Sequence, residues 1–131
     1  MHEWALAEAV VLTVKDYAEK NKLEKIREVV VVLGELQQID DEVFLFALRE
    51  TAGLHGISFE AKIKKQETEL KCLSCGKKWK PRKLKQEIGF EAAELVHFVP
   101  EAAHAYLKCP KCGSPDFRIV KGRGVSIESI K

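Results

Sequence analysis

One stretch decides much of the fold: Val29-Val30-Val31-Val32-Leu33-Gly34. Five apolar residues follow one another, four of them β-branched, and a glycine ends the run. β-Branched side chains favour extended backbone, and an unbroken apolar run of this length is typical of a strand covered on both faces. The sequence therefore predicts a buried strand at residues 29–33.

Two helices are predicted on either side of this strand, because apolar side chains recur there at spacings of three and four residues. Residues 1 to about 22 form the first helix, and its predicted buried stripe comprises Leu6, Val10, Thr13 and Tyr17. Asp40 offers an N-cap for the second helix, and Gly53 lies near its end. The predicted buried stripe of the second helix comprises Phe44, Ala47, Leu48 and Thr51.

Further strands are predicted where apolar and polar residues alternate. This alternation occupies residues 57–64, and residues 125–130 repeat it after two nearby glycines. We expect an α/β fold in which two helices pack on a small mixed sheet of about three strands. In this interpretation residues 1–66 and 122–131 form one domain, and residues 67–121 form a second domain inserted into it.

The inserted segment contains all four cysteines, arranged as two pairs with two residues between the members of each pair. The pairs are Cys72-Leu73-Ser74-Cys75 and Cys109-Pro110-Lys111-Cys112, and a glycine follows each. Two such knuckles can place four thiolates at the corners of a tetrahedron, as in a structural zinc site. We predict a zinc-ribbon-like domain whose zinc is bound by Cys72, Cys75, Cys109 and Cys112. A zinc ion with four protein ligands has no open position for substrate, so it would hold structure rather than catalyse.

Other proteins use similar cysteine pairs for different chemistry. A thioredoxin-like redox centre has a single pair at the start of a helix, which does not match two pairs each followed by glycine. The rubredoxin-like iron site of an electron carrier uses similar knuckles, so the sequence does not separate iron from zinc. A zinc ribbon that binds nucleic acid or a protein is the main alternative. Its candidate surface is Lys77–Lys85, which combines Trp79 with six cations, as base stacking and phosphate contacts require.

The overall composition excludes several classes of protein. No apolar run approaches the roughly 20 residues that cross a bilayer, and 46% hydrophobic with 32% charged residues is typical of a soluble globular protein. A formal net charge of only +2 argues against a dedicated nucleic-acid binder. The start, Met1-His2-Glu3-Trp4, does not resemble a signal peptide, so we expect a reducing cytoplasm in which paired thiols bind metal.

The first residues offer a second metal site. The order His2-Glu3-Trp4-Ala5-Leu6 lacks the second histidine of a H-E-x-x-H zinc protease, so that enzyme is excluded. The Met1 amine, the backbone nitrogen of His2 and its imidazole can form adjoining chelate rings around one ion, and Glu3 can add a donor. Nitrogen-rich sites of this kind suit nickel(II) or copper(II). Alternatively, His2 and Glu3 are ordinary residues of an exposed helix start, where a carboxylate favours the helix dipole.

Taken together, these motifs resemble the HypA family of nickel metallochaperones, which act in [NiFe]-hydrogenase maturation. The resemblance rests on the start Met1-His2-Glu3, on Val32–Leu36, and on two cysteine pairs that close near Gly122–Val125. It covers essentially the whole chain. It implies an α/β fold, transported nickel bound by Met1, His2 and Glu3, and structural zinc on the four cysteines.

The resemblance also implies that the protein is not an enzyme. Members of this family pass nickel towards the hydrogenase large subunit together with HypB, a nucleotide-hydrolysing accessory protein. The chain itself lacks a G-x-x-x-x-G-K-[ST] motif, so hydrolysis would belong to that partner. The sequence leaves the oligomeric state open, including a homodimer.

One feature resembles the archaeal branch of the family. The 33 residues between the cysteine pairs exceed the spacing of the bacterial members. This segment carries His97, a candidate for a further nickel ligand, and His104, whose claim is weaker. His55, in a turn before Gly56, has the weakest claim.

Overall fold

The computed structural model of the chain describes residues 2–37, 39–81 and 88–131. The chain forms two compact units. Unit 1 comprises Met1–Val32, Ile39–Lys64 and Val125–Lys131, and unit 2 comprises Leu33–Gln38 and Lys65–Gly124. In the described ranges, no helix combines the length and the apolar character needed to cross a bilayer.

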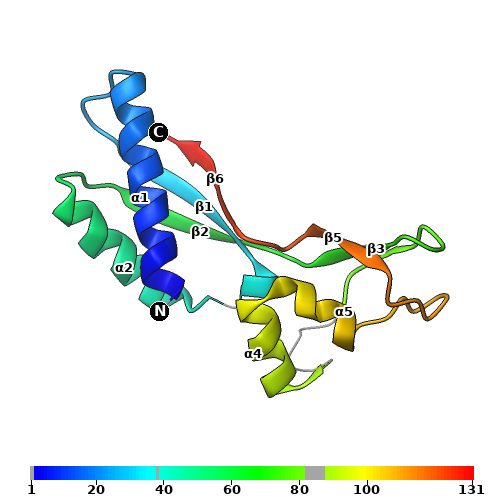
Figure 1. Cartoon of the computed structure of the whole chain (residues 1–131). Coiled ribbons are helices and arrows are strands. Elements are labelled where there is room, and N and C mark those ends of the chain that lie inside the picture. The colour runs from blue at the N-terminus through cyan, green and yellow to red at the C-terminus, as the bar shows by residue number, and fades with distance from the viewer. Residues whose placement is uncertain (1, 38, 82–87) are drawn as a thin grey trace. The chain divides into compact units, whose positions relative to one another are not determined.

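Unit 1 is built on a three-stranded sheet with the order β2-β1-β6 (Figure 1). Its elements are α1 (His2–Lys20), β1 (Glu28–Gly34), α2 (Asp41–Leu54), β2 (Glu60–Gln66) and β6 (Val125–Ile130), of which β1 and β2 run on into unit 2. β1 and β6 are antiparallel, because Glu28 and Lys131 exchange both backbone hydrogen bonds. β2 begins beside the start of β1, where the Glu60 N–H donates to the Arg27 carbonyl, so these two strands run parallel. The prediction of a mixed sheet is confirmed.

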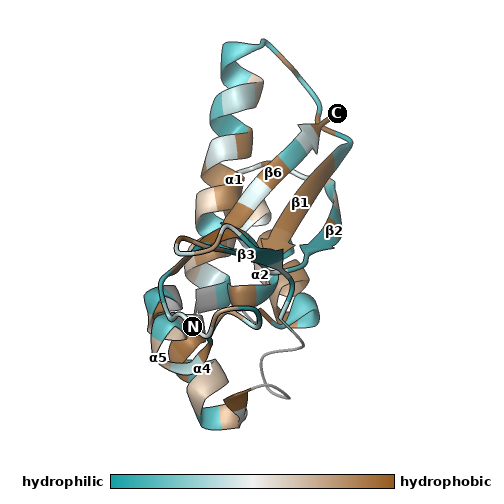
Figure 2. Cartoon of the chain, turned by 90° about the vertical axis from the view of Figure 1, so that its right-hand side faces the viewer, coloured by the Kyte–Doolittle hydropathy of each residue, from teal (hydrophilic) through white to brown (hydrophobic). Residues whose placement is uncertain are grey.

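The two helices of unit 1 pack against each other and lie on the same side of the sheet in both views (Figures 1 and 2). β1 is brown over nearly its whole length in Figure 2, whereas the neighbouring β2 is mostly teal. Val29 and Val31 are completely buried, and Val30 on the opposite face of β1 is only 7% exposed. The predicted strand, covered on both faces, is therefore confirmed.

The buried face of α1 differs from the predicted stripe. Of the four residues predicted to be buried, only Val10 is; Tyr17, for example, is 42% exposed. The buried face comprises Ala7, Val10, Val11, Val14 and Ala18. These small or β-branched side chains let the helix backbone approach α2 and the sheet closely, while the larger Leu6 and Tyr17 flank the contact.

The start of α2 agrees with the sequence prediction. The Asp40 side chain accepts a hydrogen bond of 3.0 Å from the Val43 N–H, which satisfies one of the free donors of the first turn. The predicted stripe is buried, and Ala52 extends it by one residue. The helix runs one residue beyond Gly53, to Leu54.

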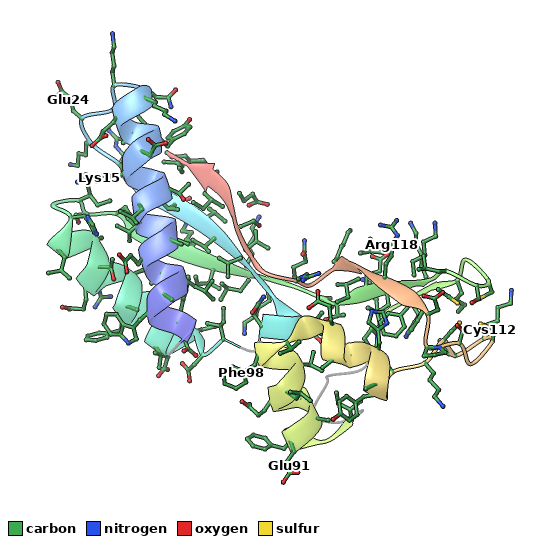
Figure 3. All side chains as sticks on the ribbon, in the orientation of Figure 1. Lys15, Glu24, Glu91, Phe98, Cys112 and Arg118 are labelled. Carbon is green, nitrogen blue, oxygen red and sulfur yellow. The ribbon has the colours of Figure 1, made fainter. Side chains whose placement is uncertain are left out.

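Unit 2 contains a second three-stranded sheet, with the order β4-β3-β5 and antiparallel pairing throughout. Its elements are η1 (Glu35–Gln37), β3 (Glu69–Cys72), β4 (Lys78–Trp79), α4 (Phe90–Phe98), η2 (Pro100–Ala102), α5 (Ala103–Tyr106) and β5 (Phe117–Lys121). In Figure 3, Cys112 lies in the loop between α5 and β5. The assignment of nickel to residues 1–66 and 122–131, and of zinc to residues 67–121, stays a prediction.

The core of unit 2 is small. Its buried cluster comprises Leu36, Leu70, Ala93, Val96, Ala103, Leu107 and Phe117. Leu36 comes from the segment between β1 and α2 and is completely buried in this cluster. Unit 2 therefore depends on a short segment that precedes α2 in the chain as well as on the long segment that carries the cysteines.

Candidate metal centre

The two cysteine pairs form knuckles with the same backbone hydrogen bonds. In the first knuckle the Gly76 N–H donates to the Cys72 carbonyl (3.0 Å), and the Cys72 N–H donates to the Lys77 carbonyl (2.8 Å). In the second knuckle the Gly113 N–H donates to the Cys109 carbonyl in the same way (2.8 Å). The two glycines have φ values of +80° and +74°, which residues with a side chain rarely adopt. This explains why a glycine follows each pair.

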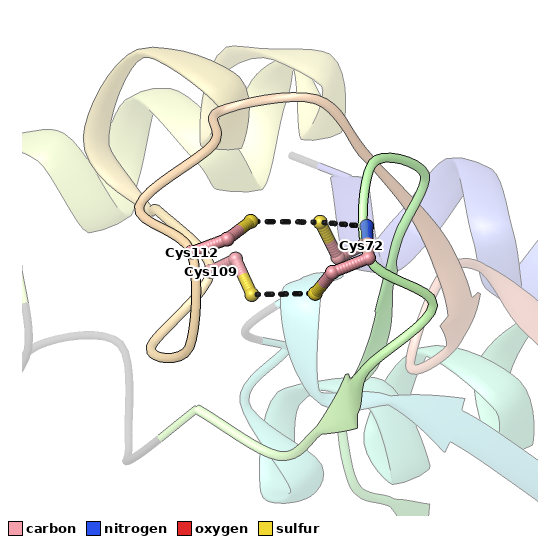
Figure 4. Close-up of side chains that lie close together, drawn as sticks. Cys72, Cys109 and Cys112 are labelled. Carbon is pink, nitrogen blue, oxygen red and sulfur yellow. Dashed lines mark hydrogen bonds between the residues drawn. The ribbon is translucent and has the colours of Figure 1, made fainter.

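The knuckles bring the four sulfur atoms together (Figure 4). Cys72 Sγ lies 3.5 Å from Cys112 Sγ, and Cys75 Sγ lies 3.6 Å from Cys109 Sγ. All four sulfurs lie within 4.8 Å of one another. A zinc–sulfur bond of about 2.3 Å requires sulfurs about 3.8 Å apart in a tetrahedron, whereas a disulfide requires about 2.05 Å. The geometry therefore fits four free thiols around a metal ion.

The backbone of the knuckles stabilises negative charge on some of the sulfurs. A hydrogen bond from the Cys75 N–H lowers the pKa of the Cys72 thiol. Burial raises the pKa of Cys109, but hydrogen bonds from its knuckle backbone, including that of Cys112, outweigh burial and bring it to about 6. For Cys112, a backbone hydrogen bond from Ser114 is outweighed by the contact with Cys72 and by burial, which raise its pKa to about 12. Full ionisation of the cluster therefore needs a cation, and thiolate donors suit zinc or iron.

Hydrogen bonds between residues next to the cysteines also join the two knuckles. The Ser74 hydroxyl donates to the Ser114 hydroxyl (3.1 Å), and the Leu73 N–H donates to the Asp116 carbonyl (2.9 Å). His104 is not brought together with any cysteine. Its Nδ1 lies 3.1 Å from the Pro115 carbonyl oxygen, and its ring stacks on Phe117.

These outer contacts were not predicted from the sequence. Serine and histidine are common residues, and nothing in the spacing of Ser74, Ser114 or His104 indicates that they meet. Their contacts depend on the antiparallel pairing of β3 with β5, which places the two knuckles side by side.

The proposed nickel residues are only partly described. Met1 lies outside the described residues, and α1 begins at His2. Burial raises the pKa of the Glu3 carboxyl, but hydrogen bonds from the backbone of Glu3 itself and of Asp40 contribute to a net lowering from 4.5. The Glu3 carboxylate is therefore held near the start of α1. His97 lies in α4, but the position of its side chain is outside the description.

The remaining candidates are His55 and the basic segment Lys77–Lys85. His55 follows α2 as its C-cap, and its N–H donates to carbonyls of the last turn. Within the basic segment, Lys78 and Trp79 form β4, and residues 82–87 lie outside the described residues. The Trp79 ring packs edge-on against Phe117 at 5.6 Å and against the core of unit 2. This position favours a core role for Trp79 over the base-stacking role of the alternative interpretation.

Comparison with known proteins identifies the family. A family model described as "Hydrogenase/urease nickel incorporation, metallochaperone, hypA" matches residues 1–131. The chain belongs to this family. The hydrogenase maturation factor HypA of Pyrococcus abyssi is 46% identical over the whole chain and 95% of its own length. That of Thermococcus kodakarensis is 44% identical, again over the whole chain and 95% of its own length.

Solved HypA structures share the fold at lower identity. The solution structure of the nickel metallochaperone HypA from Helicobacter pylori has a TM-score of 0.60 and 21% identity, covering 98% of this chain and 95% of that one. A second solution structure of a HypA protein has a TM-score of 0.62 and 23% identity, covering 100% and 95%. The chain thus has the mixed α/β fold of these HypA structures.

Proposed function

We propose that this protein is a carrier, not an enzyme, that binds nickel(II) at its N-terminus and delivers it for [NiFe]-hydrogenase maturation. The observation that carries the proposal is the match of a nickel-incorporation family model to residues 1–131. The relatives named above, which are hydrogenase maturation factors, support the same role. The proposed nickel ligands are Met1, His2 and Glu3.

The position of His2 at the start of α1 suits this chemistry. The first N–H groups of a helix have no carbonyl partner one turn earlier, so the His2 nitrogen can bind metal without breaking a helical hydrogen bond. The amine, this nitrogen and the imidazole would then follow one another around the ion. Such a set of nitrogen donors suits nickel(II).

The same position limits the affinity of the site, which suits a carrier. The N-terminus of a helix carries a partial positive charge that opposes a bound cation. The Glu3 carboxylate beside it, whose pKa is lowered, supplies negative charge that offsets part of this repulsion. We infer a site strong enough to load and weak enough to release nickel.

The four-cysteine cluster has a separate task in this proposal. Cys72, Cys75, Cys109 and Cys112 would hold a structural zinc ion, which links the two knuckles and offers no open position for substrate. Metal analysis of the purified protein should find one zinc per chain. A coloured protein that contains iron would instead support the electron-carrier interpretation.

The partners and location follow from the family and stay part of the proposal. We expect a HypB-type nucleotide-hydrolysing protein and the hydrogenase large subunit as partners, in the cytoplasm. His97 in α4 is proposed as an additional nickel ligand, and a homodimer is compatible with the proposal. For His97, loss of a nickel absorption band in His97→Ala would support the assignment, and an identical spectrum would remove it from the ligand set.

Nickel titration tests the N-terminal site. The experiment compares wild-type protein, His2→Ala, and a chain extended by one N-terminal glycine, with His55→Ala as the control that removes a histidine elsewhere in unit 1. We expect the first two variants to lose most of the nickel affinity and the control to keep it. Affinity should also fall on acidification, because the amine and the imidazole must lose protons to bind.

The titration has a clear contrary outcome. Unchanged stoichiometry and affinity in both His2→Ala and the extended chain would show that nickel binds elsewhere. Trp4 emission is measured in every sample, so that loss of nickel binding through misfolding of unit 1 is recognised.

A further inference from the structure

Three cations stand in a row across the sheet of unit 2. Lys71 in the central strand β3 lies directly opposite Lys78 of β4 on one side and Arg118 of β5 on the other. Residues directly opposite each other in antiparallel strands point to the same face, with Cβ atoms about 4.5–5.5 Å apart. Three positive charges therefore share one face within about 10 Å.

The neighbouring row of residues, on the other face of the sheet, is apolar, so the three cations are confined to the outer face. There Leu70, which belongs to the core of unit 2, lies opposite Trp79 and Ile119, which are partly buried and pack against that core. Successive residues of a strand alternate between faces, so the cations point away from this core. In Figure 3, Arg118 projects from the side of β5 opposite α4 and α5.

Among the described residues, Lys71, Lys78 and Arg118 form no ion pair within 4.0 Å. Other cations of unit 2 do have partners. The ion pairs are Lys80 with Glu67, Lys121 with Glu69, and Arg123 with Glu101. Like charges directly opposite each other destabilise a sheet, so the row is costly to the free protein.

The near-neutral net charge of the whole chain is the sum of a positive unit 2 and a negative unit 1. Unit 2 contains 13 lysines and arginines against eight aspartates and glutamates, a formal charge of +5, whereas unit 1 carries 9 against 12, a formal charge of −3. Four thiolates with one zinc ion would lower the charge of unit 2 by two and leave it positive. A partner that meets unit 2 on this face should therefore be negative.

We propose that the row formed by Lys71, Lys78 and Arg118 is a docking site for an acidic helical segment of a protein partner. Carboxylates three or four residues apart on a helix lie about 5–6 Å from one another, close to the spacing of the strands that carry the cations. A nucleic acid fits the face less well. Three cations are fewer than the six to ten phosphate contacts of a typical DNA binder, and Trp79 is on the buried face, where it cannot stack on bases.

A binding experiment on zinc-loaded, nickel-free protein tests the proposal independently of the nickel site. The probe is a fluorescein-labelled helical peptide of about 20 residues with three glutamates at successive i, i+4 positions. A peptide of the same composition with these glutamates spread around the helix is the first control. The test variant carries Lys71→Gln, Lys78→Gln and Arg118→Gln. We expect it to bind the probe about tenfold more weakly than wild-type protein, because three surface ion pairs are lost.

A matched variant removes the same charge from paired cations of the same unit. It carries Lys80→Gln, Lys121→Gln and Arg123→Gln, and we expect its affinity to change less than about twofold. Zinc content and Trp79 emission confirm that unit 2 is folded in both variants. Equal weakening in the two variants, or equal affinity for the two peptides, would overturn the proposal. So would tighter binding of a single-stranded RNA, or self-association of the chain that the test variant abolishes.

Discussion

The two units have nearly the same length but are stabilised in different ways. Among the described residues, unit 1 buries 14 apolar side chains, contributed by two helices, the strand β1 and the segments that join them. By the same measure unit 2 buries ten, and two of these are the cysteines Cys72 and Cys109. Burial of apolar area is the main favourable term in folding, so we expect the core of unit 2 to contribute less stability than the core of unit 1. We therefore expect unit 2 to need a metal ion at its cysteine cluster in a way that unit 1 does not.

Removal of the proposed zinc ion is therefore the largest expected perturbation. Structural zinc contributes about 10–16 kcal/mol in zinc-finger peptides, far more than a cluster of seven side chains has in reserve. Each unit contains one of the two tryptophans, Trp4 in unit 1 and Trp79 in unit 2. In Trp4→Phe a chelator should shift the remaining emission to the red, and in Trp79→Phe it should leave the emission unchanged.

The substitution Cys109→Ser checks the same point without a chelator. Cys109 is one of the two buried cysteines, so loss of its sulfur should give the same red shift of Trp79 emission. If Trp79 keeps its native emission in zinc-free protein, the small core is sufficient and the comparison of the two units is wrong.

A cavity in the core of unit 1 should destabilise unit 1 and leave unit 2 unchanged. Phe44 is completely buried on α2, and Phe44→Ala should cost about 3–5 kcal/mol of the free energy of unfolding of unit 1. Denaturant unfolding followed by Trp4 emission measures this loss, while zinc content should stay at one per chain. Phe46→Ala on the same helix is the control, because Phe46 is 53% exposed and touches Trp4 only at its edge. Loss of zinc from Phe44→Ala would mean that the units do not fold independently.

The sequence predicted the parts of the fold that depend on local pattern. β1 and the buried stripe of α2 follow from unbroken or periodic apolar residues, and the cysteine cluster follows from two short spacings. The prediction of the buried stripe of α1 was wrong. Leu6 and Tyr17 match the helical period as well as do the small residues that make the close contact, so the period alone did not distinguish the two sets.

Contacts between distant segments could not be predicted from the sequence. Leu36 follows β1 yet fills the core of unit 2, and no local pattern distinguishes it from a residue of unit 1. The hydroxyl contact between Ser74 and Ser114 and the stacking of His104 likewise need the pairing of β3 with β5. Sequence reasoning found the four cysteines that cluster, but not the residues that position them.

Gly122 offers a smaller perturbation that is confined to unit 2. Its φ is +99°, and a Cβ there would lie 2.6 Å from the Cα of Thr68, which is buried. Gly122→Ala should therefore cost about 1–3 kcal/mol or more through backbone strain and overlap. Gly124→Ala has a similar φ of +78° but open space around the new Cβ, so it isolates the strain. Thermal unfolding of zinc-loaded protein, followed by Trp79 emission, measures both, and equal losses would show that the overlap is relieved by relaxation.

The smallest expected effect is a gain in stability on replacing Lys71. Lys71 lies opposite two cations, and such pairs are unfavourable by about 0.2–1 kcal/mol, so Lys71→Thr should stabilise unit 2 by a similar amount. Threonine also favours strands, so the matched control is Lys121→Thr on β5, where the lysine faces Glu69 and no gain from relieved repulsion is expected. The difference between the two variants in thermal unfolding therefore isolates charge repulsion. Raising the salt concentration should shrink that difference, because exposed charges are screened. If Lys71→Thr gains no more than the control, the row costs the free protein nothing, and its like charges need no explanation through a binding partner.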